Sequence, residues 1–250
     1  MKVLTYNVYN GLKEDERFED FIAFINKEDP HVLLLQELVG WQDNNFNILH
    51  SFLRKTIFDH YRYLSTDTGF DIATFSKKPI RGCEKLKSDL HHGALIVTLS
   101  DLHICNLHLN PFSESERVKE VKKILSHLHR KNILVGGDFN SLSKKDEYDK
   151  EKLIESFNKT QLAKFGEEKI LFDCIQVVER TLNDMYINYG SGKGYTVPTG
   201  FNEDDAHMSK LRLDYFFGRV IGKDVIDVKV LRNRRTERIS DHYPVLLEYV

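Results

Sequence analysis

The feature that most constrains this chain is a series of short apolar runs, each ending on an acid, an amide or a histidine. Residues 133–135 (Ile-Leu-Val) are the clearest case, since Gly136, Gly137, Asp138 and Asn140 follow them. A β-branched apolar run bounded by glycine is typical of a buried strand. A spacing of two on extended backbone puts Asp138 and Asn140 on one side. The pair suits a metal, a water or a phosphate oxygen, and it equally suits an Asx turn.

Similar polar residues follow other runs of strand length. They are Asn7, Gln36, Glu37, His108, Asp214, Asp241 and His242. Taken singly, each is explained by a turn, a half-buried histidine or a cross-strand ion pair. In α/β sheets, however, ligands bind at strand ends, and so many buried polar groups need a common partner. Together these residues indicate one shared site.

The apolar pattern predicts an α/β fold. Helices are expected over 14–26, over 48–58, after a capping box at Ser113–Glu116, and once within the Lys/Glu-rich stretch 143–170. Besides the runs at 2–6, 31–37 and 133–135, strands are expected near 61–64, 72–76, 80–86, 94–99, 102–109, 195–198, 212–218, 225–231 and 243–250, with a tight hairpin at Ser100-Asp101. We expect a single domain over residues 1–250, with helices outside two packed sheets.

Composition excludes several classes of protein. The net charge of −2 provides no global positive field for nucleic acid or membrane, so any phosphate site has to be local. Cys83, Cys105 and Cys174 are too few and too far apart for a disulfide framework or a zinc site, which fits a reducing compartment. Neither a signal peptide nor an apolar run of about 18 residues is present. We therefore expect a cytoplasmic protein without a membrane span.

The acids predict a metal site. Glu37, Asp138 and Asp241 supply hard oxygen atoms, which favour Mg²⁺ or Mn²⁺ over a structural zinc. Two histidines beside such an ion suit proton transfer and charge stabilisation at a phosphate. A histidine in this role needs a carboxylate to hold its tautomer, and Asp214 or Asp241 could provide it.

Six motifs in chain order resemble the endonuclease/exonuclease/phosphatase superfamily. They are Thr-Tyr-Asn7, Leu-Gln-Glu37, Asn-Leu-His108-Leu, Gly-Asp138-Phe-Asn140, Arg-Leu-Asp214-Tyr and Ser-Asp241-His242-Tyr-Pro-Val. This superfamily includes deoxyribonuclease I, exonuclease III, sphingomyelinases, inositol-polyphosphate 5-phosphatases, tyrosyl-DNA phosphodiesterase and deadenylases. The motifs span residues 5 to 245, nearly the whole chain. The resemblance implies a four-layer α/β sandwich and hydrolysis of a phosphoester with a divalent metal.

The resemblance also implies a role for each motif residue. Glu37 would hold the metal, with Asn7 and Asp241 nearby. Asp138 would orient or deprotonate the attacking water, and Asn140 would help to place it. His242, held by Asp214, would stabilise charge or act as the acid/base, and His108 would bind a non-bridging oxygen.

The motif Asn-Leu-His108-Leu distinguishes the chain from exonuclease III-type apurinic-site endonucleases. Those enzymes usually carry Tyr-x-Pro at this point, and Tyr-Thr-x-Trp where this chain has Tyr195-Thr196-Val197-Pro198. The His108 form is similar to deoxyribonuclease I, sphingomyelinases and tyrosyl-DNA phosphodiesterase. Base-excision repair is therefore disfavoured.

A basic run precedes the last motif and could bind a polyanion. Arg232, Arg234 and Arg235 are its predicted substrate-binding residues, although a solvated loop explains the run as well. Trp41, and with it Tyr9 and Phe112, could stack on a base, or could be packing residues. We expect a monomeric phosphodiesterase acting on nucleic acid. A phosphatase, sphingomyelinase or phosphoinositide-type hydrolase is the alternative, and an inactive binding relative is a third.

Overall fold

Two mixed β-sheets form the centre of the protein. The computed structural model describes residues 1–166, 169–201, 207, 209–219 and 224–250. In these residues one sheet has seven strands in the order β10 (Gly190–Ser191), β12 (Val225–Val230), β13 (Val245–Tyr249), β1 (Lys2–Asn7), β2 (Val32–Gln36), β4 (Ile72–Ser76) and β3 (His60–Leu64). The other has six, in the order β5 (Gly82–Leu86), β6 (Ala94–Leu99), β7 (Leu102–His108), β8 (Ile133–Asp138), β11 (Asp214–Arg219) and β9 (Asn183–Asp184).

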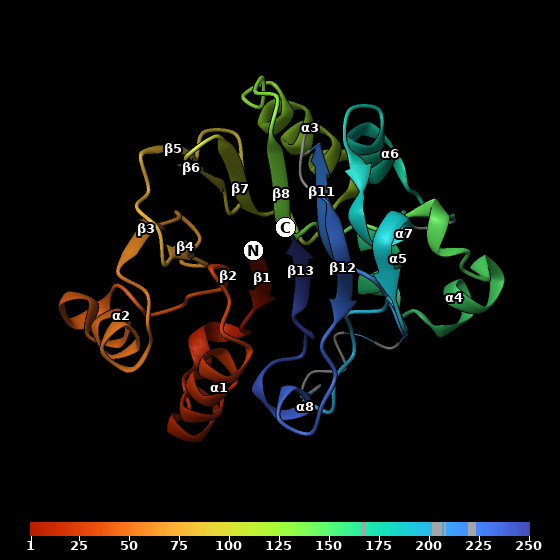
Figure 1. Ribbon diagram of the computed structural model, residues 1–250. Helices are drawn as coiled ribbons and strands as arrows, with labels where there is room; N and C mark the ends of the chain where they lie inside the picture. Colours follow the sequence, from red (N-terminus) through yellow and green to blue (C-terminus); the bar gives the residue numbers. More distant parts are fainter. Residues whose placement is uncertain (167–168, 202–206, 208, 220–223) are drawn as a thin grey trace.

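The apolar faces of the sheets determine four layers. Val3, Leu34 and Val228 of the first sheet pack with Val97 and Phe216 of the second in a core between the sheets. A second core lies under α1 (Asp15–Glu28) and α2 (Asp43–Lys55), and a third lies under α3 (Glu114–Leu125) and α6 (Asp173–Glu179). Figure 1 shows these two helix pairs on opposite sides of the molecule. The predicted four-layer α/β sandwich is confirmed.

Two glycines let the neighbouring strands pack closely against β8. Gly137 has φ of +142°, and a Cβ there would lie 2.0 Å from the Leu107 carbonyl oxygen of β7. A Cβ on Gly136 would lie 2.5 Å from the Phe216 ring of β11. Since β7 and β11 both pair with β8, only glycine fits between them at these positions. At both glycines the backbone of β8 is therefore in close contact with its neighbouring strands.

Several helices differ from the sequence prediction. α1 is two residues longer at its C-terminal end, and α2 begins five residues earlier than expected and ends three residues sooner. The stretch 143–170 contains a 3₁₀ turn, η2 (Lys144–Asp146), and two helices, α4 (Lys150–Ser156) and α5 (Lys159–Phe165), in place of one helix. The break occurs because Asn158 and Gln161 form a capping box that starts α5 anew.

Other details were also mispredicted or missed. Ser113 is the N-cap residue of α3, but its hydroxyl lies against Ser115 and makes no capping hydrogen bond. The strand expected near 195–198 is a single bridge between Val197 and Leu211. The Ser100-Asp101 hairpin between β6 and β7 is as predicted. The elements that were not predicted are η1 (Asn10–Leu12), α7 (Met185–Tyr189), α8 (Thr236–Ile239), α6, β9 and β10.

Within the described residues no helix has the length and apolar character needed to cross a membrane.

Candidate active site

Strand register brings the polar strand ends together. Asn7 at the end of β1 pairs with Gln36 of the parallel strand β2, next to Glu37. In the other sheet His108 at the end of β7 pairs with Asp138 of β8. Asp138 also pairs with Asp214 at the start of β11. Each of these residues lies at the end of its strand on the same edge of its sheet. Their positions at strand ends in the sequence therefore predicted that they lie close together.

A pocket of about 580 Å³ opens at this edge. Its wall includes Glu37, His108, Asp138, Asn140, Asp241 and His242, all of which are predicted site residues. It also includes Tyr9, Asn10, Phe70, His91, His92, Pro111, Phe112, Asn158, Thr160, Gln161, Lys164 and His207. Asn7 and Asp214 lie directly behind this wall and contact residues in it.

Asp138 is held at the centre of the pocket by donors from two directions. Its Oδ1 accepts the Asn140 backbone N–H at 2.8 Å, and its Oδ2 accepts the Asn7 amide at 3.0 Å. The first bond is an Asx turn, so the turn and the site are the same structure. The Nε2 atoms of His108 and His242 lie 3.6 Å and 3.9 Å from Oδ2. One carboxylate oxygen therefore faces two imidazoles at the wall of the pocket.

His242 is oriented by a buried carboxylate. Its Nδ1 lies 2.7 Å from Asp214 Oδ2, the partner that the resemblance implied. Burial alone lowers the pKa of His242, but the carboxylates of Asp214, Asp241 and Asp138 outweigh it and raise this pKa to about 10. The imidazole is therefore held protonated, with Nε2–H directed toward Asp138 and the pocket.

His108 has the opposite electrostatic environment. Burial, together with His242 and Lys164, lowers its pKa well below the ordinary value, so the ring is neutral. Its Nδ1 is buried and has no hydrogen-bond partner among the described residues. The proton therefore belongs on Nε2, facing the pocket. His92 stacks on this ring with centroids 4.1 Å apart and is itself anchored to the Thr68 hydroxyl at 2.7 Å.

Glu37 and Asp241 form an acidic pair in the same wall. Glu37 accepts hydrogen bonds from the Asn7 amide and the Asn10 backbone N–H, both at 3.0 Å. Burial and the charge of Asp241 raise the pKa of Glu37 to about 7. In the described part of the chain no lysine or arginine forms an ion pair with Glu37. Glu37 and Asp241 repel each other, and no basic side chain is paired with Glu37 in this part of the structure. Two such carboxylates are suited to bind a hard divalent cation between them.

Asn7 orients carboxylates in this structure. Its amide nitrogen donates to both Glu37 and Asp138, while its Oδ1 accepts the Tyr9 backbone N–H at 3.1 Å. The amide oxygen is therefore already engaged with the backbone. Direct ligation by Asn7 stays a prediction, and the contacts present link the acidic pair to Asp138.

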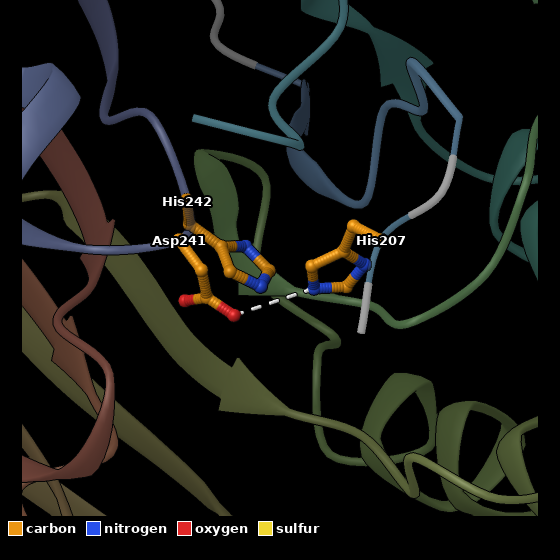
Figure 2. A group of neighbouring side chains, drawn as sticks. All are labelled: His207, Asp241 and His242. Carbon is orange, nitrogen blue, oxygen red and sulfur yellow. Dashed lines mark ion pairs between the residues drawn. The ribbon is translucent and has the colours of Figure 1, made fainter. Parts of the chain in front are cut away.

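His207 contacts Asp241 and was not predicted. Figure 2 shows its ring facing the Asp241 carboxylate, with His242 beside them; Nε2 of His207 is 3.4 Å from Asp241 Oδ2. Two triplets of side chains have ligand atoms within 4.8 Å of one another in the described residues, namely His207, Asp241, His242 and Asp138, Asp214, His242. Glu37 belongs to neither triplet. A metal bound by both Glu37 and Asp241 would therefore have ligand atoms that lie farther apart than those of either triplet.

Lys164 of α5 is a second unpredicted residue. Its Nζ donates to Asn140 Oδ1 at 2.6 Å, and the Asn140 amide nitrogen donates to the Leu109 carbonyl at 3.0 Å. Both ends of the Asn140 amide are thus bonded to protein. Asn140 connects Lys164 to the strand end that carries Asp138.

The predicted substrate-binding residues lie elsewhere. Trp41 is fully buried, donates to the Gly11 carbonyl and packs on Phe18 and Phe52, so it has no free face for a base. Arg232 stacks on Tyr195, and Arg235 pairs with Asp20 of α1.

Arg234 is exposed, and none of the three arginines belongs to the pocket wall formed by described residues. The stacking role predicted for Trp41 is therefore wrong, because the ring is buried. Substrate binding by the three arginines stays a prediction, and they would contact a substrate outside this pocket. Tyr9 and Phe112, the other two aromatics considered, do line it.

Comparison with known proteins agrees with this fold. Residues 4–242 match the Endonuclease/Exonuclease/phosphatase family. No curated protein matches the chain by sequence.

Among solved structures, the 3′ phosphatase NExo from Neisseria bound to a product DNA hairpin is similar at TM-score 0.74 and 20% identity, with 100% of this chain and 99% of that chain covered. An endonuclease/exonuclease/phosphatase family protein from Leptotrichia buccalis has TM-score 0.73 and 19% identity over 100% and 99%. A mannosyl-6-phosphatase from Bacteroides thetaiotaomicron has TM-score 0.65 and 18% identity over 100% and 99%. Because the family model matches residues 4–242, nearly the whole chain, this chain belongs to the endonuclease/exonuclease/phosphatase family.

Proposed function

We propose that this protein hydrolyses a phosphoester by in-line attack of a water molecule, with the help of a divalent cation, Mg²⁺ or Mn²⁺. The observation that carries the proposal is the meeting of Asp138, His108 and the Asp214–His242 pair around one point of the pocket. An acceptor, a neutral N–H donor and a charged N–H donor are the groups that a phosphoryl transfer needs.

Each residue has a distinct part in this proposal. Asp138 accepts a proton from the water or orients it, since its other lone pairs are held by Asn7 and Asn140. His242 donates from Nε2 to a phosphate oxygen or to the leaving group, and Asp214 supports its positive charge. His108 donates to a non-bridging oxygen from the other sheet. Glu37 and Asp241 would hold the cation, which neutralises charge that grows on the phosphate.

A kinetic comparison of two buried aspartates tests this assignment. Asp138→Asn should lower kcat by about 10²-fold or more, because the amide can no longer accept the proton. Asp71→Asn is the matched control: Asp71 is equally buried but bonds to Tyr63 and Thr66 outside the pocket wall. Bis-p-nitrophenyl phosphate and p-nitrophenyl phosphate serve as substrates, with Mg²⁺, Mn²⁺ or EDTA. Equal turnover of Asp138→Asn and wild type would overturn the proposal. Absence of wild-type cleavage under every condition would favour an inactive binding relative.

Nucleic acid is the proposed source of the phosphoester. Phe112 is 63% exposed at the pocket rim and contacts His91 edge-on, and Tyr9 also lines the pocket. Aromatic side chains that line a phosphate site suit base stacking, and a structurally similar protein was captured with a DNA hairpin. Phe112→Ala should raise KM for an oligonucleotide and leave KM for p-nitrophenyl phosphate unchanged. Equal effects on both would favour a small phosphomonoester, the substrate class of the mannosyl-6-phosphatase that is also similar in structure.

A further inference from the structure

Lys164 adds a positive charge to the pocket from an element outside both sheets. It lies near the end of α5, and Asn158, Thr160 and Gln161 of the same segment also line the pocket. Burial lowers the pKa of Lys164 to about 8, although Asp138 opposes this effect. The amine is therefore mostly protonated at pH 7. An ammonium has three N–H donors, and the Asn140 contact uses one of them.

A buried ion pair keeps this lysine in place. Arg117 of α3 is fully buried and donates to the backbone carbonyl of Lys164, to the Asn110 carbonyl at 2.9 Å and to Glu114 at 2.9 Å. Glu114 in turn accepts the Ser141 hydroxyl at 2.8 and 2.9 Å. The end of α5 is thus attached to α3 and to the segment directly after Asp138 and Asn140. Hydrogen bonds therefore hold both the backbone of Lys164, through Arg117, and its side chain, through Asn140.

The donors of the pocket can be compared with the oxygens of a phosphate. A bound phosphodiester carries one negative charge and two non-bridging oxygens, whereas a phosphomonoester carries close to two charges and three such oxygens. His108 and His242 face the point beside Asp138 from the two strand-end motifs. Lys164 of α5 is a third donor in the pocket wall, and its ammonium group carries a full positive charge. A group of this kind interacts more strongly with a dianion than with a monoanion.

We propose that Lys164 binds the third terminal oxygen of a phosphomonoester and so makes this site prefer terminal phosphates to internal phosphodiesters. This inference rests on the proposed phosphoester hydrolysis. It assigns Asn140 a positioning role, because the Asn140 amide holds Lys164 rather than pointing a free donor at the ligand. It also predicts that orthophosphate, the dianionic product, binds through Lys164.

Removal of the charge should change specificity more than overall activity. In Lys164→Met, kcat/KM for p-nitrophenyl phosphate should fall by about 10²-fold, as for loss of one donor to developing charge. For bis-p-nitrophenyl phosphate the fall should be at least about tenfold smaller. Lys159→Met is the matched control, since Lys159 is an exposed lysine of the same helix that does not line the pocket. Lys164→Arg, which keeps the charge, should retain part of the monoester preference.

Two further measurements separate the possible outcomes. Inhibition of diester cleavage by inorganic phosphate should weaken in Lys164→Met but not in Lys159→Met. Oligonucleotides with and without a terminal phosphate, compared with a sugar phosphate, identify the source of the monoester. If wild type cleaves both p-nitrophenyl substrates and Lys164→Met slows them equally, the inference is overturned while the proposed function stands. If wild type cleaves neither, the proposed function itself fails.

Discussion

Asp214→Asn isolates the charge that supports His242. The amide keeps the size of the side chain and can still form a hydrogen bond to Nδ1, which lies 2.7 Å from the carboxylate oxygen. The substitution removes the negative charge nearest to His242. Because Asp214 and His242 are both buried, water cannot replace that charge. A buried hydrogen bond to a charged group contributes about 1.5–3 kcal/mol. At 1.4 kcal/mol per factor of ten, this predicts a fall in kcat of roughly 10- to 150-fold.

Single-turnover and steady-state kinetics with saturating metal measure this effect directly. KM should change little, since Asp214 lies behind His242 and is not part of the pocket wall. Asp184→Asn is the control, because Asp184 is an equally buried aspartate of the same sheet that pairs with Arg212 at 2.7 Å instead of with a histidine. It should lower stability and leave kcat of the folded protein unchanged. Wild-type kcat in Asp214→Asn, or equal losses of kcat in the two variants, would refute the reasoning.

Three other predictions follow from particular contacts. Glu37→Gln removes one half of the acidic pair and should raise the Mg²⁺ concentration for half-maximal activity by about tenfold or more, as measured by metal titration after EDTA treatment; an unchanged titration would exclude Glu37 as a ligand. Gly137→Ala places a Cβ against the Leu107 carbonyl at positive φ and should destabilise the fold by more than about 1 kcal/mol in urea unfolding; wild-type stability would contradict this steric argument. Burial lowers the pKa of His92 below its ordinary value, so the unfolded state binds the extra proton and stability should fall as pH drops below about 6.5. His92→Phe should remove up to about 1.4 kcal/mol per pH unit of that slope, and an unchanged slope would show that His92 does not cause it.

The sequence predicted the sheets better than the connections between them. Strand runs such as those ending at Asn7 and Asp138 are apolar, short and bounded by polar residues, so hydrophobic pattern alone identifies them. The Lys/Glu-rich stretch 143–170 has no strong apolar period, and the division into α4 and α5 depends on an Asn158–Gln161 capping box. The single bridge at Val197 depends on contact with Leu211. Local propensity carries little information about such long-range pairing.

The same distinction explains which residues of the candidate site could be placed together from the sequence. The proximity of Asp138, His108 and Asp214 was predictable because strand register converts their positions at strand ends into neighbours in space. The basic run seemed to lie near the site only because Arg234 and Arg235 are close to Asp241 in sequence. Arg235 instead pairs with Asp20 on α1.

Lys164, in contrast to the arginines, lines the pocket but was not predicted. It lies in a charged stretch that contains no recognisable motif. Its place in the pocket depends on Arg117 and Glu114, which join α5 to the segment after β8. No property of the sequence around Lys164 encodes that junction, so a positive charge in the pocket wall becomes visible only when the chain is folded. Since the proposed catalytic residues of this chain lie at strand ends, residues that distinguish one phosphoester from another are best sought on the segments that connect the strands.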